Sequence, residues 1–202
     1  MFNGIIFNQG EIKKIKSRKN GSNIFIKSNI KISKKNLGIS ISCDGVCLTL
    51  ISFKNKLLEF YLSKETIKRS KFNVIKIGDN INLELPLKFG NKISGHICQG
   101  HVDTIAKVDK ITKKDKAYLY NFQIKKKYLK DLIEKASISI NGVSLTISKV
   151  TKKGFQIWLI PHTLKLTNLS ILNIGDIVNI EIDILSKYIK KFYKKWKTNL
   201  AP

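Results

Sequence analysis

The feature that most constrains this chain of 202 residues is an internal repeat. The stretch GVCLTLIS begins at Gly45, and the nearly identical GVSLTISK begins at Gly142, 97 positions later. The same offset aligns YLSKETIKRSKF (61–72) with WLIPHTLKLTNL (158–169), and IGDNINLEL (77–85) with IGDIVNIEI (174–182). Near the start, FNGII (2–6) matches CQGHV (98–102) loosely at an offset of 96. An offset kept through three segments predicts a duplicated domain, with a period too long for a solenoid repeat. We expect the copies at 1–89 and 90–185, followed by a tail at 186–202.

Each copy is dominated by short runs that are typical of β-strands. The first copy contains NIFIKSNI, GISISC, VCLTLIS and KLLEFYL, and the second contains KAYLYNFQIK, SISI, VSLTISKV and FQIWLI. Short strands at regular spacing predict an all-β fold, either a small barrel or a sandwich. The stretch SKETIKRS predicts a short helix, with Ser63 or Thr66 as its N-cap.

The tail has a different pattern. In DILSKYIKKFYKKWK, apolar side chains recur every four residues, with lysines between them. This spacing predicts an amphipathic helix whose stripe consists of Ile184, Leu185, Tyr188, Ile189, Phe192 and Trp196. The stripe is expected either to pack back on its own barrel or to be shared between subunits.

The composition narrows the classes of function. The formal net charge is +24, but Arg18 and Arg69 are the only arginines and the lysines are dispersed. This pattern favours a solvated surface over a nucleic-acid interface, where arginine usually reads phosphates and base edges. Neither a membrane-crossing segment nor a secretory leader is expected. Three cysteines without framework spacing indicate a reducing compartment, which we take to be the cytoplasm. Three histidines and these cysteines offer too few grouped ligands to predict a metal site.

The repeated segments GVCLTLIS and GVSLTISK place small polar side chains on one face of a strand and apolar side chains on the other. Because alternate strand residues face opposite ways, Val46, Leu48 and Leu50 share one face, and Cys47 and Thr49 share the other. The second copy repeats this pattern, with an apolar face of Val143, Leu145 and Ile147 and a polar face of Ser144, Thr146 and Ser148. The apolar face predicts a core, and the polar face indicates a ligand pocket or an ordinary exposed surface.

Three further positions are candidates for chemistry. His96 and His101 are five residues apart, so a straight strand places them on opposite faces and they do not form a metal pair. Either one is a candidate proton-transfer group, with a structural hydrogen bond as the alternative for His96. The segment IPHT (160–163) predicts a turn that closes over a ligand.

Taken together, these motifs resemble riboflavin synthase (alpha chain). The motifs MFNGII, DGVCLTL, SGHICQGHVD, INGVSLTI, IPHTLKLTNL and NIEIDILSKY occur here in the order and spacing of that family, over about residues 1–190. Three positions depart from the usual residues, since Asn3 replaces Thr, Asp44 replaces Asn and Ala136 replaces Gly. Asp44 is expected to alter the charge near the first pocket.

The resemblance implies two similar six-stranded antiparallel barrels and a C-terminal helix that assembles a homotrimer. It implies a cofactor-free dismutation, the last step of riboflavin biosynthesis, in which one 6,7-dimethyl-8-ribityllumazine gives a four-carbon unit to another. The products are riboflavin and 5-amino-6-ribitylamino-2,4-pyrimidinedione. Two substrate molecules meet between the N-terminal barrel of one subunit and the C-terminal barrel of a neighbour. Association with lumazine synthase is a further implied partnership.

The resemblance also carries site residues onto this sequence. The first pocket is expected to comprise Gly4, Ile5, Ile6, Ser40, Cys47, Leu48, Thr49, Tyr61, Leu62, Ser63, Lys64, Glu65 and Thr66. The second is expected to comprise Gly100, His101, Val102, Lys135, Ser144, Leu145, Thr146, Trp158, Leu159, Ile160, Pro161, His162 and Thr163. In this assignment His101 transfers the proton, Ser144 and Thr146 orient the donor lumazine, and Cys47 and Ser40 act on the acceptor.

Two other functions fit parts of the pattern. Lumazine proteins share the architecture and hold a lumazine or flavin without turning it over, but they tend to lose the polar residues of one pocket. Here both pockets keep theirs, which favours the enzyme. A basic nucleic-acid-binding barrel is the other alternative, and it predicts an affinity that falls steeply with salt.

Overall fold

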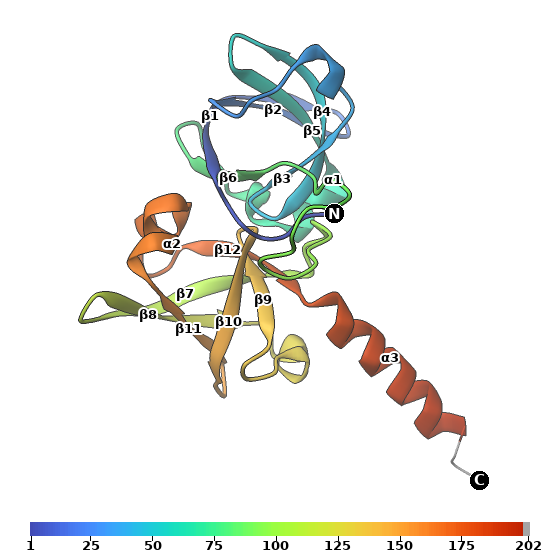
Figure 1. Cartoon of the computed structure of the whole chain (residues 1–202), viewed down its shortest axis with the longest axis vertical. Coiled ribbons are helices and arrows are strands. Elements are labelled where there is room, and N and C mark those ends of the chain that lie inside the picture. The colour runs from blue at the N-terminus through green and yellow to red at the C-terminus, as the bar shows by residue number, and fades with distance from the viewer. Residues whose placement is uncertain (200–202) are drawn as a thin grey trace.

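The computed structural model describes residues 1–199, and within this range the chain forms two closed antiparallel barrels and a long terminal helix (Figure 1). The first barrel contains β1 (Asn8–Arg18), β2 (Gly21–Ser28), β3 (Ser40–Cys43), β4 (Val46–Lys54), β5 (Leu57–Ser63) and β6 (Asn80–Glu84). The second contains β7 (Thr104–Lys114), β8 (Ala117–Ile124), β9 (Ser137–Ile140), β10 (Val143–Val150), β11 (Gly154–Leu159) and β12 (Ile177–Ile182). The strand order around the first barrel is β1-β2-β5-β4-β3-β6, and the second follows the equivalent order, β7-β8-β11-β10-β9-β12. The predicted duplication into two six-stranded barrels is therefore confirmed.

Short helices follow equivalent strands in the two copies. Helix α1 (Lys64–Arg69) follows β5, and α2 (Pro161–Leu166) follows β11. Short stretches of 3-10 helix lie in other connections: η1 (Lys34–Asn36), η2 (Lys71–Asn73), η3 (Lys126–Asp131) and η4 (Asn168–Ile171). The Ser63 hydroxyl accepts a hydrogen bond from the Thr66 amide, which identifies Ser63 as the N-cap of α1.

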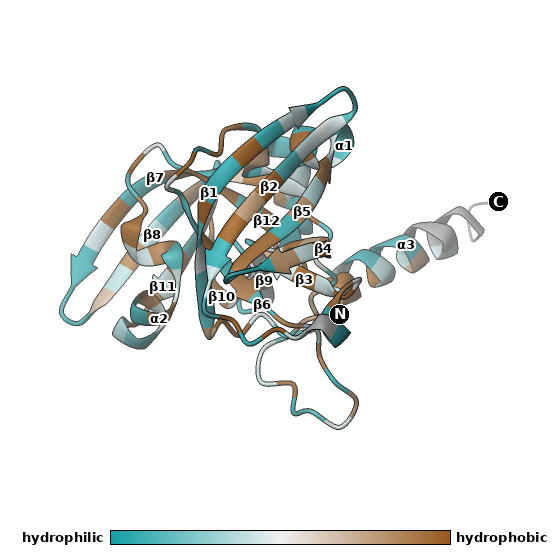
Figure 2. Cartoon of the chain, turned by 90° about the horizontal axis from the view of Figure 1, so that it is seen from above, coloured by the Kyte–Doolittle hydropathy of each residue, from teal (hydrophilic) through white to brown (hydrophobic). Residues whose placement is uncertain are grey.

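Each barrel encloses its own apolar core. The alternation along the repeated strands is as predicted, since Val46, Leu48 and Leu50 are buried in the first core and Val143 and Ile147 in the second. Hydrophobic and hydrophilic residues alternate along β1 and β2 in Figure 2. Both copies also carry a bulge at the same place, because the register shifts between Leu50 and Ser52 in β4 and between 147 and 149 in β10.

The barrels meet through two tight turns that belong to the repeat. Asp44 and Gly45 join β3 to β4, Asn141 and Gly142 join β9 to β10, and all four residues have positive φ angles between 46° and 79°. This conformation is typical of the Asp-Gly and Asn-Gly hairpin turns. A Cβ atom on Gly45 would lie 2.8 Å from the Gly142 amide nitrogen, and the reverse distance is also 2.8 Å. Glycine is therefore required at both positions for the two backbones to touch.

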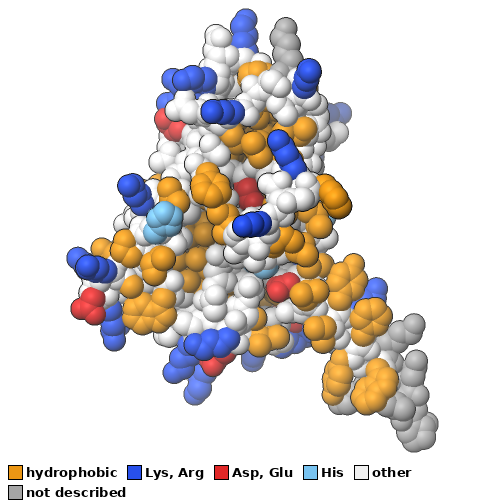
Figure 3. Space-filling view, viewed as in Figure 1, with side chains coloured by type: hydrophobic (Ala, Val, Ile, Leu, Met, Phe, Trp, Pro, Cys, Tyr) orange, Lys and Arg blue, Asp and Glu red, His pale blue; other side chains and the backbone are white. Residues whose placement is uncertain are grey.

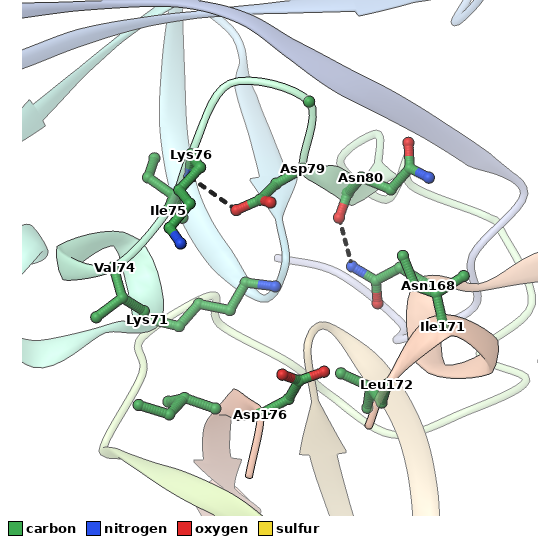
Figure 4. Close-up of a pocket in the computed structure, with 12 residues that line it drawn as sticks. Lys71, Val74, Ile75, Lys76, Asp79, Asn80, Asn168, Ile171, Leu172 and Asp176 are labelled. Atoms are coloured by element: carbon green, nitrogen blue, oxygen red, sulfur yellow. Dashed lines mark hydrogen bonds between the residues drawn. The ribbon is translucent and has the colours of Figure 1, made fainter. Parts of the chain in front are cut away.

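A buried polar network surrounds this contact. The Asn82 side chain donates to the Asn141 carbonyl oxygen at 2.9 Å, and the Asn179 side chain donates to the Asp44 carbonyl oxygen at 2.9 Å. Asn168 donates to the Asp44 Oδ1 atom at 2.8 Å. The same Asn168 amide also donates to the Asn80 carbonyl oxygen beside a groove of about 360 Å³ (Figure 4). Each barrel thus satisfies polar groups of the other, which fixes their relative placement.

Asp44 belongs to this junction and does not line the first pocket, so its expected effect on the charge there stays a prediction. Its side chain is fully buried, and its Oδ2 atom lies 2.5 Å from Nζ of Lys71. The repeat aligns Asp44 with Asn141 and Lys71 with Asn168, so an acid–base pair in one copy occupies the place of two amides in the other. Burial raises the pKa of Asp44, while the Lys71 ammonium opposes that rise.

The terminal helix α3 (Ile184–Asn199) projects away from both barrels (Figure 1). Its apolar stripe faces outward (Figure 3), and Leu185, Ile189 and Phe192 expose between 61% and 69% of their surface. The alternative in which the stripe packs back on its own barrel is therefore wrong. Lys187 pairs with Asp103 at 2.6 Å and anchors the first turns. Residues 200–202 of the predicted tail lie outside the described range, and no helix within 1–199 is long and apolar enough to cross a membrane.

We predict that Lys71→Asn destabilises the chain by about 3–5 kcal/mol, because it leaves the buried Asp44 carboxylate without its cation. The double variant Asp44→Asn/Lys71→Asn reproduces the amide pair of the second copy and should recover most of that loss. Urea unfolding monitored by tryptophan fluorescence measures both. A double variant no more stable than Lys71→Asn would contradict this account of the junction.

Candidate functional site

Two chain segments cross between the barrels and complete the opposite pockets. Residues 2 and 98 pair in antiparallel fashion, with both backbone hydrogen bonds formed, at 2.8 and 3.0 Å. Beyond this bridge the Gly4 carbonyl oxygen accepts from the Ser144 amide at 2.7 Å. The Gly100 carbonyl oxygen accepts from the Cys47 amide at 2.8 Å. The N-terminal segment therefore adds to the second barrel, and the segment after the linker adds to the first.

This exchange corrects the predicted composition of the two pockets. Gly4, Ile5 and Ile6 were expected beside Cys47, but Ile6 packs into the core of the second barrel. Gly100, His101 and Val102 were expected beside Ser144, but Val102 packs against the core of the first barrel. The two segments have exchanged partners, while the strand residues of each pocket stay where the sequence placed them.

The first pocket is a cavity of about 230 Å³ between β4, α1 and the crossing segment. It is lined by Val46, Cys47, Glu65, Thr66, Arg69, Ser70, Gly100, His101 and Val102. Cys47 is half-buried and His101 is exposed. The cavity thus brings a thiol, an imidazole and a hydroxyl to one place, a combination suited to orienting a polar ligand and moving a proton.

The second pocket has a serine in the place of the thiol. The Oγ atom of Ser144 lies 2.7 Å from Nδ1 of His96, which comes from the linker between the barrels. Burial lowers the pKa of His96, so its imidazole favours the neutral form. The structural hydrogen bond considered for His96 is therefore present, and its partner is the serine of the repeated motif.

Other aligned positions also differ in chemistry between the two pockets. His101 aligns with Ile5, Arg69 with Leu166, and Glu65 with the exposed His162. The first pocket is therefore the more highly charged, and its Glu65 and Arg69 side chains form an ion pair on α1. The two pockets therefore combine equivalent backbones with unlike side chains.

Several predicted site residues point into the cores instead of the pockets. Leu48 is 4% exposed, and Leu62 and Leu159 are each 1% exposed. A ligand would therefore reach these three residues through their backbone atoms. Leu145 is half-buried and packs against the second core. On the polar faces, Ser40 pairs in register with the exposed Thr49, and Ser137 pairs with the exposed Thr146.

The segments after β5 and β11 lie at the rims of the barrels. Tyr61 and Trp158 expose 40% and 42% of their surface, and Ile160 exposes 55%. The Ser63 and Thr66 hydroxyls lie 2.9 Å apart, and Lys64 is exposed. The turn predicted for IPHT is instead the first turn of α2, with Pro161 at its N-terminus, His162 exposed and Thr163 half-buried. Lys135 is exposed on the loop before β9.

Two buried glutamates were missed from the sequence. Glu84 accepts from the amides of Asn3 and Gly4 at 2.7 and 3.0 Å, and Glu181 accepts from those of Gln99 and Gly100 at 2.7 and 2.9 Å. Burial raises the pKa of Glu84 to about 7 and also raises that of Glu181. Their signal was present in the aligned NINLEL and IVNIEI, where one glutamate recurs at the same place in a strand rich in Ile, Leu and Val.

Comparison with known families adds independent findings. The lumazine binding domain model matches residues 3–86 and, a second time, residues 99–183. The riboflavin synthase of Actinobacillus pleuropneumoniae is 35% identical over 195 residues, which cover 96% of this chain and 91% of the relative. The riboflavin synthase of Bacillus subtilis (strain 168) is 35% identical over 199 residues, covering 98% and 93%.

Solved structures show a similar architecture. The structure of LumP complexed with 6,7-dimethyl-8-(1'-D-ribityl) lumazine matches with a TM-score of 0.77 at 27% identity, covering 90% of this chain and 98% of that one. LumP complexed with riboflavin matches with a TM-score of 0.80 at 26% identity, covering 90% and 99%.

We predict that one thiol per native chain reacts rapidly with Ellman's reagent. Cys43 and Cys98 are buried, and burial raises both thiol pKa values, that of Cys98 to about 12, whereas Cys47 is half-buried at the pocket. Cys47→Ser should remove the fast phase, and denaturant should expose the slow thiols. A native chain without a fast phase, or a fast phase that persists in Cys47→Ser, would contradict this assignment.

Proposed function

The chain belongs to the riboflavin synthase family, and from this membership we propose that each of its two pockets holds one molecule of 6,7-dimethyl-8-ribityllumazine. Its function is the dismutation that gives riboflavin and 5-amino-6-ribitylamino-2,4-pyrimidinedione. The observation that carries this function is the similarity to riboflavin synthases over nearly the whole chain. The polar residues that both pockets keep support it.

The reaction needs positioning and proton transfer. The two substrates together contain all atoms of the two products, so no external oxidant or reductant is needed. A proton leaves the methyl group at C7 of the donor, and the resulting anion attacks the acceptor. Holding both rings in attack geometry can lower the barrier by about 7–11 kcal/mol. Two similar pockets that face each other supply this geometry for two identical reactants.

The residues of the pockets suggest a division of labour. His101 lies at the Cys47 pocket and is the group that takes the donor's proton when a donor faces that pocket. Cys47 and Ser40 act on the acceptor in the first barrel. Ser144, held by His96, and Thr146 orient the donor in the second barrel.

We further propose a homotrimer built through α3. The outward stripe includes Tyr188 and Trp196, which expose 54% and 62% of their surface, as an uncovered helix face would if it packs on another subunit. In such an assembly the first barrel of one chain meets the second barrel of a neighbour, and the neighbour supplies the donor. The functional units remain residues 1–89, 90–185 and 186–202, with the crossing segments exchanged.

The surroundings of the enzyme follow from its chemistry. The three cysteines are free, which fits a reducing compartment, and we propose the cytoplasm. Lumazine synthase is a proposed partner, because it would release the substrate next to the trimer.

The LumP structures make a lumazine-binding protein without turnover the second candidate. Purified chain mixed with 6,7-dimethyl-8-ribityllumazine and no added cofactor should produce riboflavin, followed by its absorbance. Bound lumazine without riboflavin would favour the binding protein.

His101→Ala should lower kcat by about 10²- to 10⁴-fold with substrate still bound, since it removes the proton acceptor. Full turnover by His101→Ala would remove this role.

We predict that Phe192→Asp dissociates the trimer and abolishes turnover, while each chain still binds lumazine. Charge on the apolar stripe would be buried without a partner in the assembly. Lys191→Asp is the matched control, because it adds the same side chain on the lysine-rich side of α3 and should stay trimeric. Sedimentation velocity and a turnover assay measure the two effects. A trimeric, active Phe192→Asp variant would contradict the proposed assembly.

A further inference from the structure

We propose that Glu84 and Glu181 are positioning residues that act across the barrels, each holding the glycine turn that walls the opposite barrel's pocket. Glu84 ends β6 of the first barrel, yet the turn it holds contacts Ser144 of the second. Glu181 lies in β12 of the second barrel, and its turn contacts Cys47 of the first. The proposal rests on the function above, since the held turns border the lumazine pockets.

The contacts are matched in the two copies. Each carboxylate accepts from two successive backbone amides, one oxygen to each, at distances between 2.7 and 3.0 Å. The second amide in each pair belongs to a glycine, Gly4 or Gly100, with a φ angle of 74° or 78°. A bidentate carboxylate is well suited to fix a turn of this kind, because one rigid group orients two donors.

Each glycine packs closely against the strand residue that carries the pocket's hydroxyl or thiol, so neither backbone can move far without the other. A Cβ atom on Gly4 would lie 2.6 Å from Cβ of Ser144, and one on Gly100 would lie 2.6 Å from Cβ of Cys47. Each glycine carbonyl also accepts from the amide of that same serine or cysteine. A shift of the turn therefore moves the backbone that carries the pocket's thiol or hydroxyl.

The cost of burial indicates that these carboxylates have a specific task. Glu84 is 9% exposed and Glu181 is 3% exposed, and no ion pair involves either one among the described residues. Burying a carboxylate is expensive unless hydrogen bonds compensate. Here the compensation comes almost entirely from the two crossing turns, so each carboxylate and its turn hold each other in place.

The charged groups around the two carboxylates differ. Glu84 faces the N-terminal amine and the buried Cys98 thiol. Glu181 faces Lys187, Asp103 and the same Cys98. Burial raises the pKa of Glu84 to about 7. Its carboxylate is therefore ionised, and its hydrogen bonds to the turn are strongest, in mildly alkaline solution. These hydrogen bonds weaken as the carboxylate is protonated below neutral pH.

The test uses thiols as local reporters, so that it does not depend on lumazine chemistry. Glu181→Gln should raise the labelling rate of Cys47 by about tenfold. The backbone amides of Gln99 and Gly100 would lose their charged acceptor, and the new side-chain amide would present a donor to them. Glu84→Gln should leave that rate unchanged, although it lies on the same barrel as Cys47. In a Cys47→Ser/Ser144→Cys background the order should reverse, with Glu84→Gln raising the labelling rate and Glu181→Gln leaving it unchanged.

Conservative variants separate positioning from general loss of structure. Glu84→Asp and Glu181→Asp keep the carboxylate and should restore much of the wild-type labelling rate and turnover. Equal labelling changes in both reporters for either Gln variant, or changes confined to the barrel that carries the glutamate, would overturn the proposal. Crossed labelling changes in a chain that makes no riboflavin would instead leave the positioning intact and refute the proposed function.

A measurement on the unmodified chain covers the case in which the Gln variants fail to fold. With glycine labelled by ¹⁵N, the Gly4 amide resonance should titrate with a midpoint near pH 7, because its acceptor is Glu84. A Gly4 resonance that does not move between about pH 5 and 9 would overturn the proposed grip.

Discussion

The architecture depends on two crossed backbone hydrogen bonds, from the Ser144 amide to the Gly4 carbonyl and from the Cys47 amide to the Gly100 carbonyl. Each hydrogen bond joins a barrel to a chain segment that continues into the other barrel. Together with the Gly45–Gly142 contact, they make the two halves one unit despite separate cores. A disturbance in either half is therefore expected to reach the pocket of the other.

Duplication followed by divergence explains why the shared GV-x-LT core of the repeated motif has Cys47 in one copy and Ser144 in the other. Two equivalent pockets would bind two identical lumazines equally well, but a dismutation needs one donor and one acceptor. The structure keeps the backbone equivalent and varies the side chains, with Cys47 and His101 in one pocket and Ser144 with His96 in the other. Among the described residues, the Cys47-to-Ser144 difference is one of several that distinguish the two pockets, and we propose that these differences assign the donor and acceptor roles.

The sequence predicted the barrels well because offset and alternation are local properties of the chain. The facing of Val46 and Cys47 followed from strand period alone. The exchange of Gly4 and Gly100 between barrels could not be predicted, because both placements give the same internal pattern, and only packing distinguishes them. The role of Asp44 at the junction could not be predicted for a similar reason, since its partner Lys71 is distant in sequence and cannot be told from the many surface lysines.

We propose that one reaction site combines the first barrel of one chain with the second barrel of another. Subunit mixing tests this arrangement. One double variant replaces Cys47 and His101 and so inactivates the first pocket. A second double variant replaces Ser144 and Thr146 and so inactivates the second pocket. The two variants are then mixed and reassembled into trimers. Randomly mixed trimers should regain about one quarter of the wild-type rate, because that share of interfaces joins two intact pockets. A mixture that stays as inactive as its parents would contradict the account.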